Sequence, residues 1–231
     1  MSVLLQFIPV IISVALVMFS ALVHEVAHGY VAYRLGDPTA KEAGRLTLNP
    51  AKHLDPFGSV VLPLLLAISG GPIFAYAKPV PYNPYRLRNP KRDEVLVALA
   101  GPASNFLQAL AAALVFRGLD IYIASNAALS YEVWSAGTGL YWVMLLLSRY
   151  AYVNLILMFF NLIPLPPLDG SKIIMPLLRG QARQTYYRIQ AYSMPILLIL
   201  LYLVPMVTAY DPLSTYFSAT AGNLFTIMLG I

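Results

Sequence analysis

Long apolar stretches separated by short polar segments dominate the hydrophobic pattern of this chain. Each stretch comes close to the roughly 20 apolar residues that a membrane-spanning helix needs, over residues 3–23, 95–116, 150–168 and 194–209. The pattern predicts an all-α polytopic membrane protein with five to six transmembrane helices. Residues 213–231 are less apolar, and they predict either a further span or a helix lying in the membrane surface.

The composition supports a membrane protein. Hydrophobic residues make up 59% of the 231 residues and charged residues 11%, whereas an ordinary soluble domain is about a quarter charged. Residues 1–23 lack the basic start and the small-residue cleavage site of a secretory signal, so we expect a retained first span. The chain has no cysteine, which excludes disulfides and limits a metal site to His, Asp and Glu ligands.

The basic residues indicate the orientation in the membrane. Thirteen of the 15 fall in three loops: Arg34, Lys41, Arg45 and Lys52; Lys78, Arg86, Arg88, Lys91 and Arg92; and Lys172, Arg179, Arg183 and Arg188. The positive-inside rule places these loops in the cytoplasm, with the N-terminus and the 117–134 connection outside. The net charge of +5 therefore reflects topology, and we expect no nucleic-acid partner. Later spans are expected at about 94–117, 138–163 and 189–208.

Residues 57–77 are predicted to form a re-entrant segment. The loops on both sides are cytoplasmic, so the chain must cross an even number of times, and about 20 residues cannot cross twice. Pro63 and the Ser-Gly-Gly-Pro at 69–72 are turn formers near its middle. Irregular backbone at that depth must face protein or water, so it should line a cavity. Residues 44–48 and 73–81 look strand-like, which predicts a β-hairpin-like segment.

Arg149 does not fit this scheme well. It lies in the middle of the third predicted span, where a charge costs about 2.5 to 3.5 kcal/mol on insertion scales. Either its side chain snorkels toward water, or the helix starts later and residues 138–148 lie at the outer interface.

His24, Glu25 and His28 are three ionisable residues at the end of the first apolar run. Two histidines four residues apart project from one face of a helix, so both imidazoles can reach one ion. This is the H-E-x-x-H arrangement, in which the glutamate acts as general base toward a metal-bound water. Ionisable residues inside a membrane are functional candidates. The alternative is a set of polar groups satisfied by their neighbours at a helix end.

Asp169 is the candidate third ligand. Of the ten acidic residues, only Glu25 and Asp169 adjoin long apolar runs without a local cluster of charges. The predicted topology brings the end of the third span to the side on which the first span ends. Three prolines within 164–167 interrupt the helix, and Gly170 permits a tight turn. The alternative is that Asp169 caps the N-terminus of the next helix.

Five motifs spread over most of the chain resemble the site-2 proteases, the intramembrane zinc metalloproteases of peptidase family M50. They are HEVAH (24–28), GRLTLNP (44–50), AKPVP (77–81), GPASN (101–105) and NLIPLPPLDG (161–170). No stretch suits a PDZ domain or an appended CBS domain, so the chain resembles the compact branch of the family. We expect one integral membrane domain over residues 1–231, with a catalytic core to about residue 175 and C-terminal helices over about 186–231.

The resemblance implies one Zn²⁺ per chain, held by His24, His28 and Asp169, with Glu25 activating a water. The reaction implied is hydrolysis of peptide bonds within or beside a transmembrane helix of a membrane-protein substrate. Asn161 is expected either to hold the substrate or to tie helices together. The expected location is the plasma membrane, with the active site near its cytoplasmic side.

Several other residues and readings stay open at this point. Asn105 is expected to serve helix packing next to the small residue Gly101, and His53 is expected to be a loop histidine outside the ligand set. An exposed strand edge at 44–48 or 73–81 would let an unwound substrate pair with it. The rival function is a transporter or channel that moves ions or protons past the same buried ionisable residues. A membrane chaperone without catalysis is a third possibility.

Overall fold

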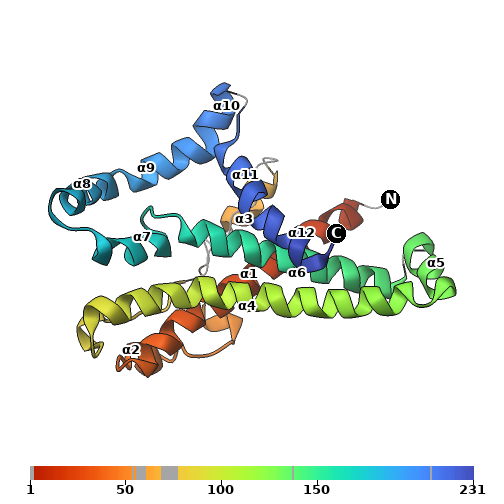
Figure 1. Cartoon of the computed structure of the whole chain (residues 1–231), viewed down its shortest axis with the longest axis horizontal. Coiled ribbons are helices and arrows are strands. Elements are labelled where there is room, and N and C mark those ends of the chain that lie inside the picture. Colours follow the sequence, from red (N-terminus) through yellow and green to blue (C-terminus); the bar gives the residue numbers. More distant parts are fainter. Residues whose placement is uncertain (1–2, 54, 56–60, 69–77, 137, 209) are drawn as a thin grey trace. The chain divides into compact units, whose positions relative to one another are not determined.

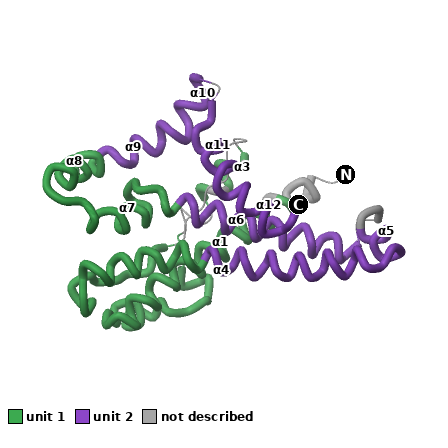
Figure 2. The backbone as a smooth tube through the Cα atoms, in the orientation of Figure 1, with its two compact units in different colours: residues 1–104, 161–191 green, residues 105–160, 192–231 purple. Residues whose placement is uncertain are grey.

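A computed structural model describes residues 3–53, 55, 61–68, 78–136, 138–208 and 210–231. In that part of the chain the regular structure is helical throughout and contains no strand (Figure 1). The prediction of an all-α membrane protein is confirmed at this level. The helices fall into two compact units, coloured in Figure 2: residues 1–104 with 161–191, and residues 105–160 with 192–231.

The first unit carries the predicted metal-binding residues. Its elements are α1 (Val3–Arg34), α2 (Thr39–Glu42), a 3-10 turn (Pro50–Lys52), α3 (Leu62–Ile68), a 3-10 turn (Pro84–Arg86), the start of α4 (Pro90–Ala124), α7 (Asp169–Ile174), a 3-10 turn (Met175–Leu177) and α8 (Gly180–Ala191). Ala32, Leu87 and Val97 form a small buried core.

Helix α1 is longer than the sequence predicted. The first span was expected to end near residue 23, but the helix continues without a break to Arg34. It stops where Gly36 takes a left-handed conformation, with φ of 111°, and the Asp37 N–H donates to the Ala32 carbonyl at 3.0 Å, as at many helix ends. The expected boundary is wrong because residues 24–34 contain no proline, and Gly29 alone does not end the helix. The H-E-x-x-H motif therefore lies inside the helix.

Asp37 fastens the chain that leaves α1. Its fully buried carboxylate accepts hydrogen bonds from the Thr39 N–H at 3.0 Å and the Asn83 N–H at 2.6 Å. Burial alone would raise the pKa of Asp37, but these bonds and the nearby Arg86 hold it below its ordinary value. The carboxylate thus joins two segments that lie 46 residues apart in the sequence.

The second unit contains the rest of α4 and the remaining helices. These are α5 (Ala127–Ala136), α6 (Gly139–Leu162), α9 (Ser193–Leu198), a π-helical turn (Ile199–Leu203), α10 (Val204–Thr208), α11 (Pro212–Phe217), a second π-helical turn (Ser218–Gly222) and α12 (Asn223–Leu229). A buried pair joins α4 to α6, since the Asn105 amide donates to the Asn154 side-chain oxygen at 2.8 Å. The packing role expected for Asn105 agrees with this bond.

Three described helices are long and apolar enough to cross a membrane: Ile11–Arg34, Pro90–Ala124 and Gly139–Asn161. A fourth is possible if α8 and residues 193–208 form one interrupted span. The expected count of five to six is therefore not confirmed. Residues 212–229 are helical, but they are not among these candidates. Arg149 lies well inside α6, so the alternative of a later helix start is wrong, and the alternative that its side chain snorkels toward water stays open.

The strand expected at residues 44–48 is absent. The Arg45 N–H donates to the Ala40 carbonyl at 2.9 Å, which closes a turn after α2. The Thr47 carbonyl accepts a bond from the His53 imidazole at 3.0 Å. The alternation of polar and apolar residues was misleading because local turns take up these backbone groups. An edge for substrate pairing is therefore lacking in this stretch.

The second strand-like stretch lies partly outside the described residues, which resume at Lys78. Residues 78–81 are not a strand, because Pro79 and Pro81 have no N–H and the other two donors are already in use. The Lys78 N–H bonds to the His53 carbonyl at 2.8 Å, and the Val80 N–H bonds to Glu25 at 2.9 Å. The re-entrant segment also falls largely outside the described residues, and it stays a prediction.

Candidate metal centre

Three buried side chains of the first unit bring one ligand atom each to a common point. His24 Nε2 and His28 Nε2 lie 3.0 Å apart, and Asp169 Oδ2 lies 3.1 Å from each of them. The three residues are 6%, 8% and 7% exposed. The histidines come from α1 and the aspartate from the first residue of α7, so the convergence expected from the sequence is present.

The local sequence explains how Asp169 reaches the histidines. Helix α6 ends at Leu162, before the proline-rich stretch, and α7 begins at Asp169. The N-cap of α7 is Leu168 and makes no side-chain cap bond, so Asp169 does not serve as the helix cap. A Cβ on Gly170 would overlap the carbonyl oxygens of Leu162 and Ile163. Only glycine lets the turn pass this close to the end of α6.

The orientation of His28 is set by α4. Its Nδ1 lies 2.6 Å from the Val97 carbonyl oxygen, and because a carbonyl only accepts, Nδ1 must carry the proton and donate it. In the neutral imidazole the lone pair is then on Nε2, which faces His24 and Asp169. A backbone carbonyl that fixes the tautomer of a ligating histidine is a common support in metal sites.

Helix α4 also approaches the site through Gly101. A Cβ at this position would stand 2.5 Å from His24 Nε2 and would overlap the His28 imidazole as well. No other residue type fits against the two rings without a shift. Gly101 therefore brings the α4 backbone into direct contact with both histidines, which is closer than the helix packing expected of the GPASN motif.

The site fits a small cation. Asp169 Oδ2 is buried and meets no hydrogen-bond donor in the described part of the chain, although both imidazole nitrogens are 3.1 Å away. Three atoms rich in lone pairs at this spacing need a shared proton or metal ion. A tetrahedral zinc with bonds of about 2.0 to 2.1 Å sets its ligand atoms about 3.3 Å apart, and the spacings of 3.0 and 3.1 Å are close to this value.

The charge of Asp169 suits the same role. Burial alone would raise the pKa of this carboxyl, but the adjacent His24 and His28 imidazoles hold it well below its ordinary value. The side chain is therefore an anion at neutral pH, as a metal ligand must be.

Glu25 is next to the site but is not one of the converging groups. It is half-buried, and its Oε2 accepts a hydrogen bond from the Val80 N–H at 2.9 Å. Val80 itself is 5% exposed. The segment that precedes α4 thus holds the carboxylate in one orientation. The sequence did not predict this contact, because nearly every residue has a backbone N–H and nothing in its residue type marks the one that binds Glu25. The only signal was that Pro79 and Pro81, on both sides of Val80, have no N–H to offer.

The remaining predicted residues lie outside the ligand cluster. Asn161 is half-buried in the last turn of α6, and its substrate role stays a prediction. His53 is 2% exposed and bonds to the Thr47 carbonyl. Burial lowers the pKa of His53, and the nearby Arg45 adds to this effect. His53 thus stabilises its loop, and it is not among the three residues that could hold a metal ion in the described part of the chain.

Comparisons with known proteins also indicate a zinc metallopeptidase. The model of peptidase family M50 matches residues 12–204. The chain is 38% identical over 196 residues to the candidate zinc metalloprotease YwhC of Bacillus subtilis, covering 85% of this chain and 81% of YwhC.

Two mycobacterial relatives, both named as candidate zinc metalloproteases Rip2, are more distant. The one from Mycolicibacterium smegmatis is 28% identical over 80% of this chain and 64% of the relative. The one from Mycobacterium tuberculosis H37Rv is 29% identical over 83% of this chain and 66% of the relative. The matches thus span slightly less than two thirds of the Rip2 proteins. No solved structure matches the chain. The family match covers the H-E-x-x-H helix and the aspartate that meets it, and the chain is therefore a zinc metallopeptidase belonging to peptidase family M50.

Proposed function

We propose that this chain is an intramembrane protease, which hydrolyses peptide bonds within or next to transmembrane segments of membrane-protein substrates. The observation that carries the proposal is the convergence of Asp169 with His24 and His28, which lie inside a helix that is long and apolar enough to span a membrane. In this proposal the three residues hold one Zn²⁺. A peptidase centre built into a membrane helix selects substrates that are themselves in the membrane.

The chemistry needs a bound zinc and a base. When bound, zinc lowers the pKa of a coordinated water to about 7 and polarises the carbonyl to be cut. Glu25 is placed to accept the proton of the attacking water and to deliver it to the leaving amine. The Val80 N–H keeps the Glu25 carboxylate in one orientation, and Val97 keeps His28 in the tautomer whose Nε2 lone pair faces the site.

The substrate must be extended locally before it is cut, since a helix uses its own amides and shields its carbonyl groups. Residues 78–81 offer carbonyl oxygens but no unused N–H, so this segment can only accept hydrogen bonds from a substrate backbone. Asn161 is the proposed side-chain partner of the substrate, because it lies in the last turn of α6, just ahead of the stretch that leads to Asp169.

The proposed location is the plasma membrane, with the site toward the cytoplasm. The motif lies two turns from the end of α1, and the basic loop after Arg34 follows it. A site near that surface is supplied with the water that hydrolysis consumes. The family match names a peptidase, and no finding favours the transporter alternative.

Zinc content and cleavage of a model transmembrane peptide test the proposal. The variants are Glu25→Gln and a matched control, Glu42→Gln. The exposed Glu42 carboxylate lies 2.8 Å from the Arg86 guanidinium and is not one of the residues of the metal centre. Glu25→Gln should retain about one zinc per chain and lose at least about 100-fold in cleavage rate, the usual scale for a general base. Glu42→Gln should match the parent. Parental cleavage by Glu25→Gln would refute the assigned role.

A further inference from the structure

A charged side chain inside α6 has no partner in its own unit. Arg149 is the eleventh of the 24 residues of α6, and its side chain is exposed. In the described part of the second unit, its guanidinium makes no hydrogen bond or ion pair. Because Gly139–Asn161 is a candidate membrane span, this charge would face lipid unless something covers it.

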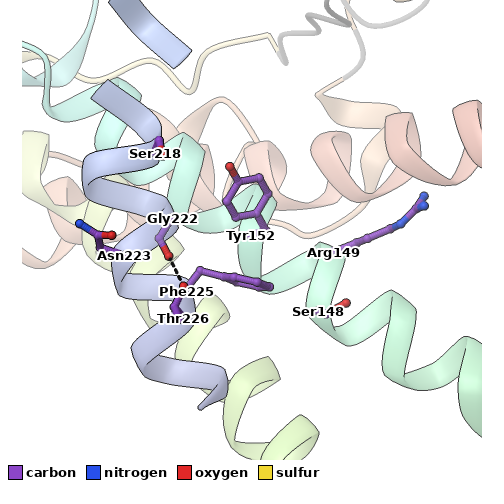
Figure 3. A pocket seen from close by; sticks show the side chains of 8 residues that line it. All are labelled: Ser148, Arg149, Tyr152, Ser218, Gly222, Asn223, Phe225 and Thr226. Atoms are coloured by element: carbon purple, nitrogen blue, oxygen red, sulfur yellow. Dashed lines mark hydrogen bonds between the residues drawn. The ribbon is translucent and has the colours of Figure 1, made fainter. Parts of the chain in front are cut away.

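Arg149 lies at the rim of a groove between α6 and the C-terminal helices. The groove measures about 460 Å³, and Figure 3 shows Arg149 extending outward from α6 beside it. Its lining consists of Ser148, Arg149, Tyr152, Ser218, Gly222, Asn223, Phe225 and Thr226. All of these residues belong to the second unit. The metal centre belongs to the first unit, so this groove is a separate feature.

Three of the six polar side chains in the groove already use a donor. Ser148, Asn223 and Thr226 each donate to a carbonyl of their own helix at 2.9 Å. In the described part of this unit the Arg149 guanidinium and the Tyr152 and Ser218 hydroxyls make no hydrogen bond, and the Asn223 amide has a second N–H beyond the one it uses. The groove therefore offers a cation with two neutral donors, which is the complement of an anion.

The C-terminal side of the groove has an unusual backbone. Ser218 and Gly222 begin and end a π-helical turn. Such turns are rare in proteins overall, and those that occur are often found at functional sites. A Cβ on Gly222 would meet ordinary contact distances of 3.6 Å or more, so the glycine is not required by close packing. Its missing side chain leaves this wall of the groove open.

The depth of Arg149 indicates what kind of anion fits. Arg149 comes ten residues after Gly139, the first residue of α6, which at about 1.5 Å per residue is about 15 Å. The hydrocarbon core is about 30 Å thick, so if α6 enters this core at its first residue, Arg149 lies near the middle. Lipid phosphates lie outside this core. A carboxylate on another helix can reach the same depth, and ionisable residues inside membranes usually pair with each other.

A second copy of this chain does not supply that carboxylate. None of its ten acidic residues lies in α6 or in the C-terminal helices α11 and α12, and those of the candidate span α4, which are Asp93, Glu94 and Asp120, lie within the first or last five residues of that helix. Glu25, the acidic residue of the α1 span, is already bonded to Val80. We propose that the groove of Arg149, Tyr152 and Ser218 docks a transmembrane helix of a different protein, which presents an Asp or Glu side chain to Arg149. The guanidinium can bind such a carboxylate with two parallel hydrogen bonds.

Binding of designed peptides tests the docking site independently of proteolysis. The full chain carrying Glu25→Gln, which should not cut, is placed in nanodiscs of neutral lipid at pH 8. The probes are two Leu-Ala transmembrane peptides that differ only in one central residue, Glu or Gln, and binding is measured by energy transfer between labels. The Glu peptide should bind about tenfold more tightly than the Gln peptide, which corresponds to about 1.4 kcal/mol.

Variants at position 149 show whether that preference depends on the guanidinium. Arg149→Gln should abolish the tenfold preference, while the exposed loop control Arg179→Gln should keep it. Arg149→Glu should prefer a peptide with a central Lys, because the charges are exchanged. Zinc content and a single size-exclusion peak establish that each variant is folded. If Arg149→Gln is not, Arg149→Met, which also removes the charge, takes its place and should likewise lose the preference.

Three outcomes would overturn the docking site. The first is an equal affinity of the parent for the Glu and Gln peptides. The second is a Glu preference that survives in Arg149→Gln. The third is Arg149-dependent binding of labelled phosphatidylglycerol over phosphatidylcholine without any Glu preference, which would assign Arg149 to a lipid phosphate. None of these results would bear on the protease proposal, because cleavage is not the measurement.

Discussion

The Gly101→Ala variant probes the close contact between α4 and the two histidines. Its Cβ would stand 2.5 Å from His24 Nε2, where ordinary contacts begin at 3.4 Å, so a ring or the helix must move by about 1 Å. Zinc sites tolerate about 0.2 Å in their bond lengths. The displacement is therefore about five times the tolerance.

The expected loss follows from that displacement. Changes in the groups that support zinc ligands typically cost 10- to 100-fold in metal affinity, and a 1 Å misplacement can cost about 100-fold in rate. We expect Gly101→Ala to lose zinc affinity by at least about tenfold and peptide cleavage by about 100-fold. Zinc affinity is measured by competition with a fluorescent chelator, and cleavage with the model transmembrane peptide.

Gly118→Ala is the matched control on the same helix. A Cβ there meets nothing within 4 Å, and both substitutions gain about 0.8 to 1.0 kcal/mol of helix propensity. The two variants therefore differ in the clash alone. Zinc affinity and cleavage of Gly101→Ala within twofold of Gly118→Ala would refute the close approach of α4 to the histidines.

Three further predictions concern the framework of the two units. Asp37→Asn should destabilise the chain by about 1 to 3 kcal/mol at pH 7. Because the folded-state pKa of Asp37 lies below its ordinary value, the difference in thermal unfolding between parent and variant should stay constant down to about pH 4 and shrink as the pH falls further; a difference that persists unchanged below that pH would contradict this. A double-mutant cycle of Asn105→Ala and Asn154→Ala should give a coupling of about 0.6 kcal/mol in unfolding, and purely additive effects would argue against the hydrogen bond. Gly170→Ala should lower both stability and zinc affinity, because its Cβ would meet backbone oxygens, whereas Gly139→Ala, with open space around its Cβ, should change neither.

The helices were predictable where apolar runs are long and uninterrupted. The second and third expected spans correspond to α4 and α6. The end of α1 was missed because the apolar run stops at residue 23, whereas the helix continues through the mixed polar and apolar residues 24–34, which no proline interrupts. The strand expected at 44–48 was wrong because alternation over five residues is weaker evidence than a turn that captures the Arg45 N–H.

The metal centre was more predictable than its surroundings. The spacing of His24 and His28 determines that they share a helix face, and the isolation of Asp169 from other charges singled it out. The supports could not be predicted in the same way. The Val97 carbonyl is a backbone group, and Gly101 contributes by having no side chain, so neither contact is visible in residue chemistry.

The bond between the Val80 N–H and Glu25 has a consequence for how this protein tolerates change. Side-chain replacements at position 80 leave the amide proton in place, and proline is the one residue type that deletes it. The orientation of the glutamate is therefore buffered against most point mutations at its partner. The residue types accepted at position 80 would be limited by the tight packing of the Val80 side chain against Gly29. The backbone hydrogen bond to Glu25 would remain in every variant except proline.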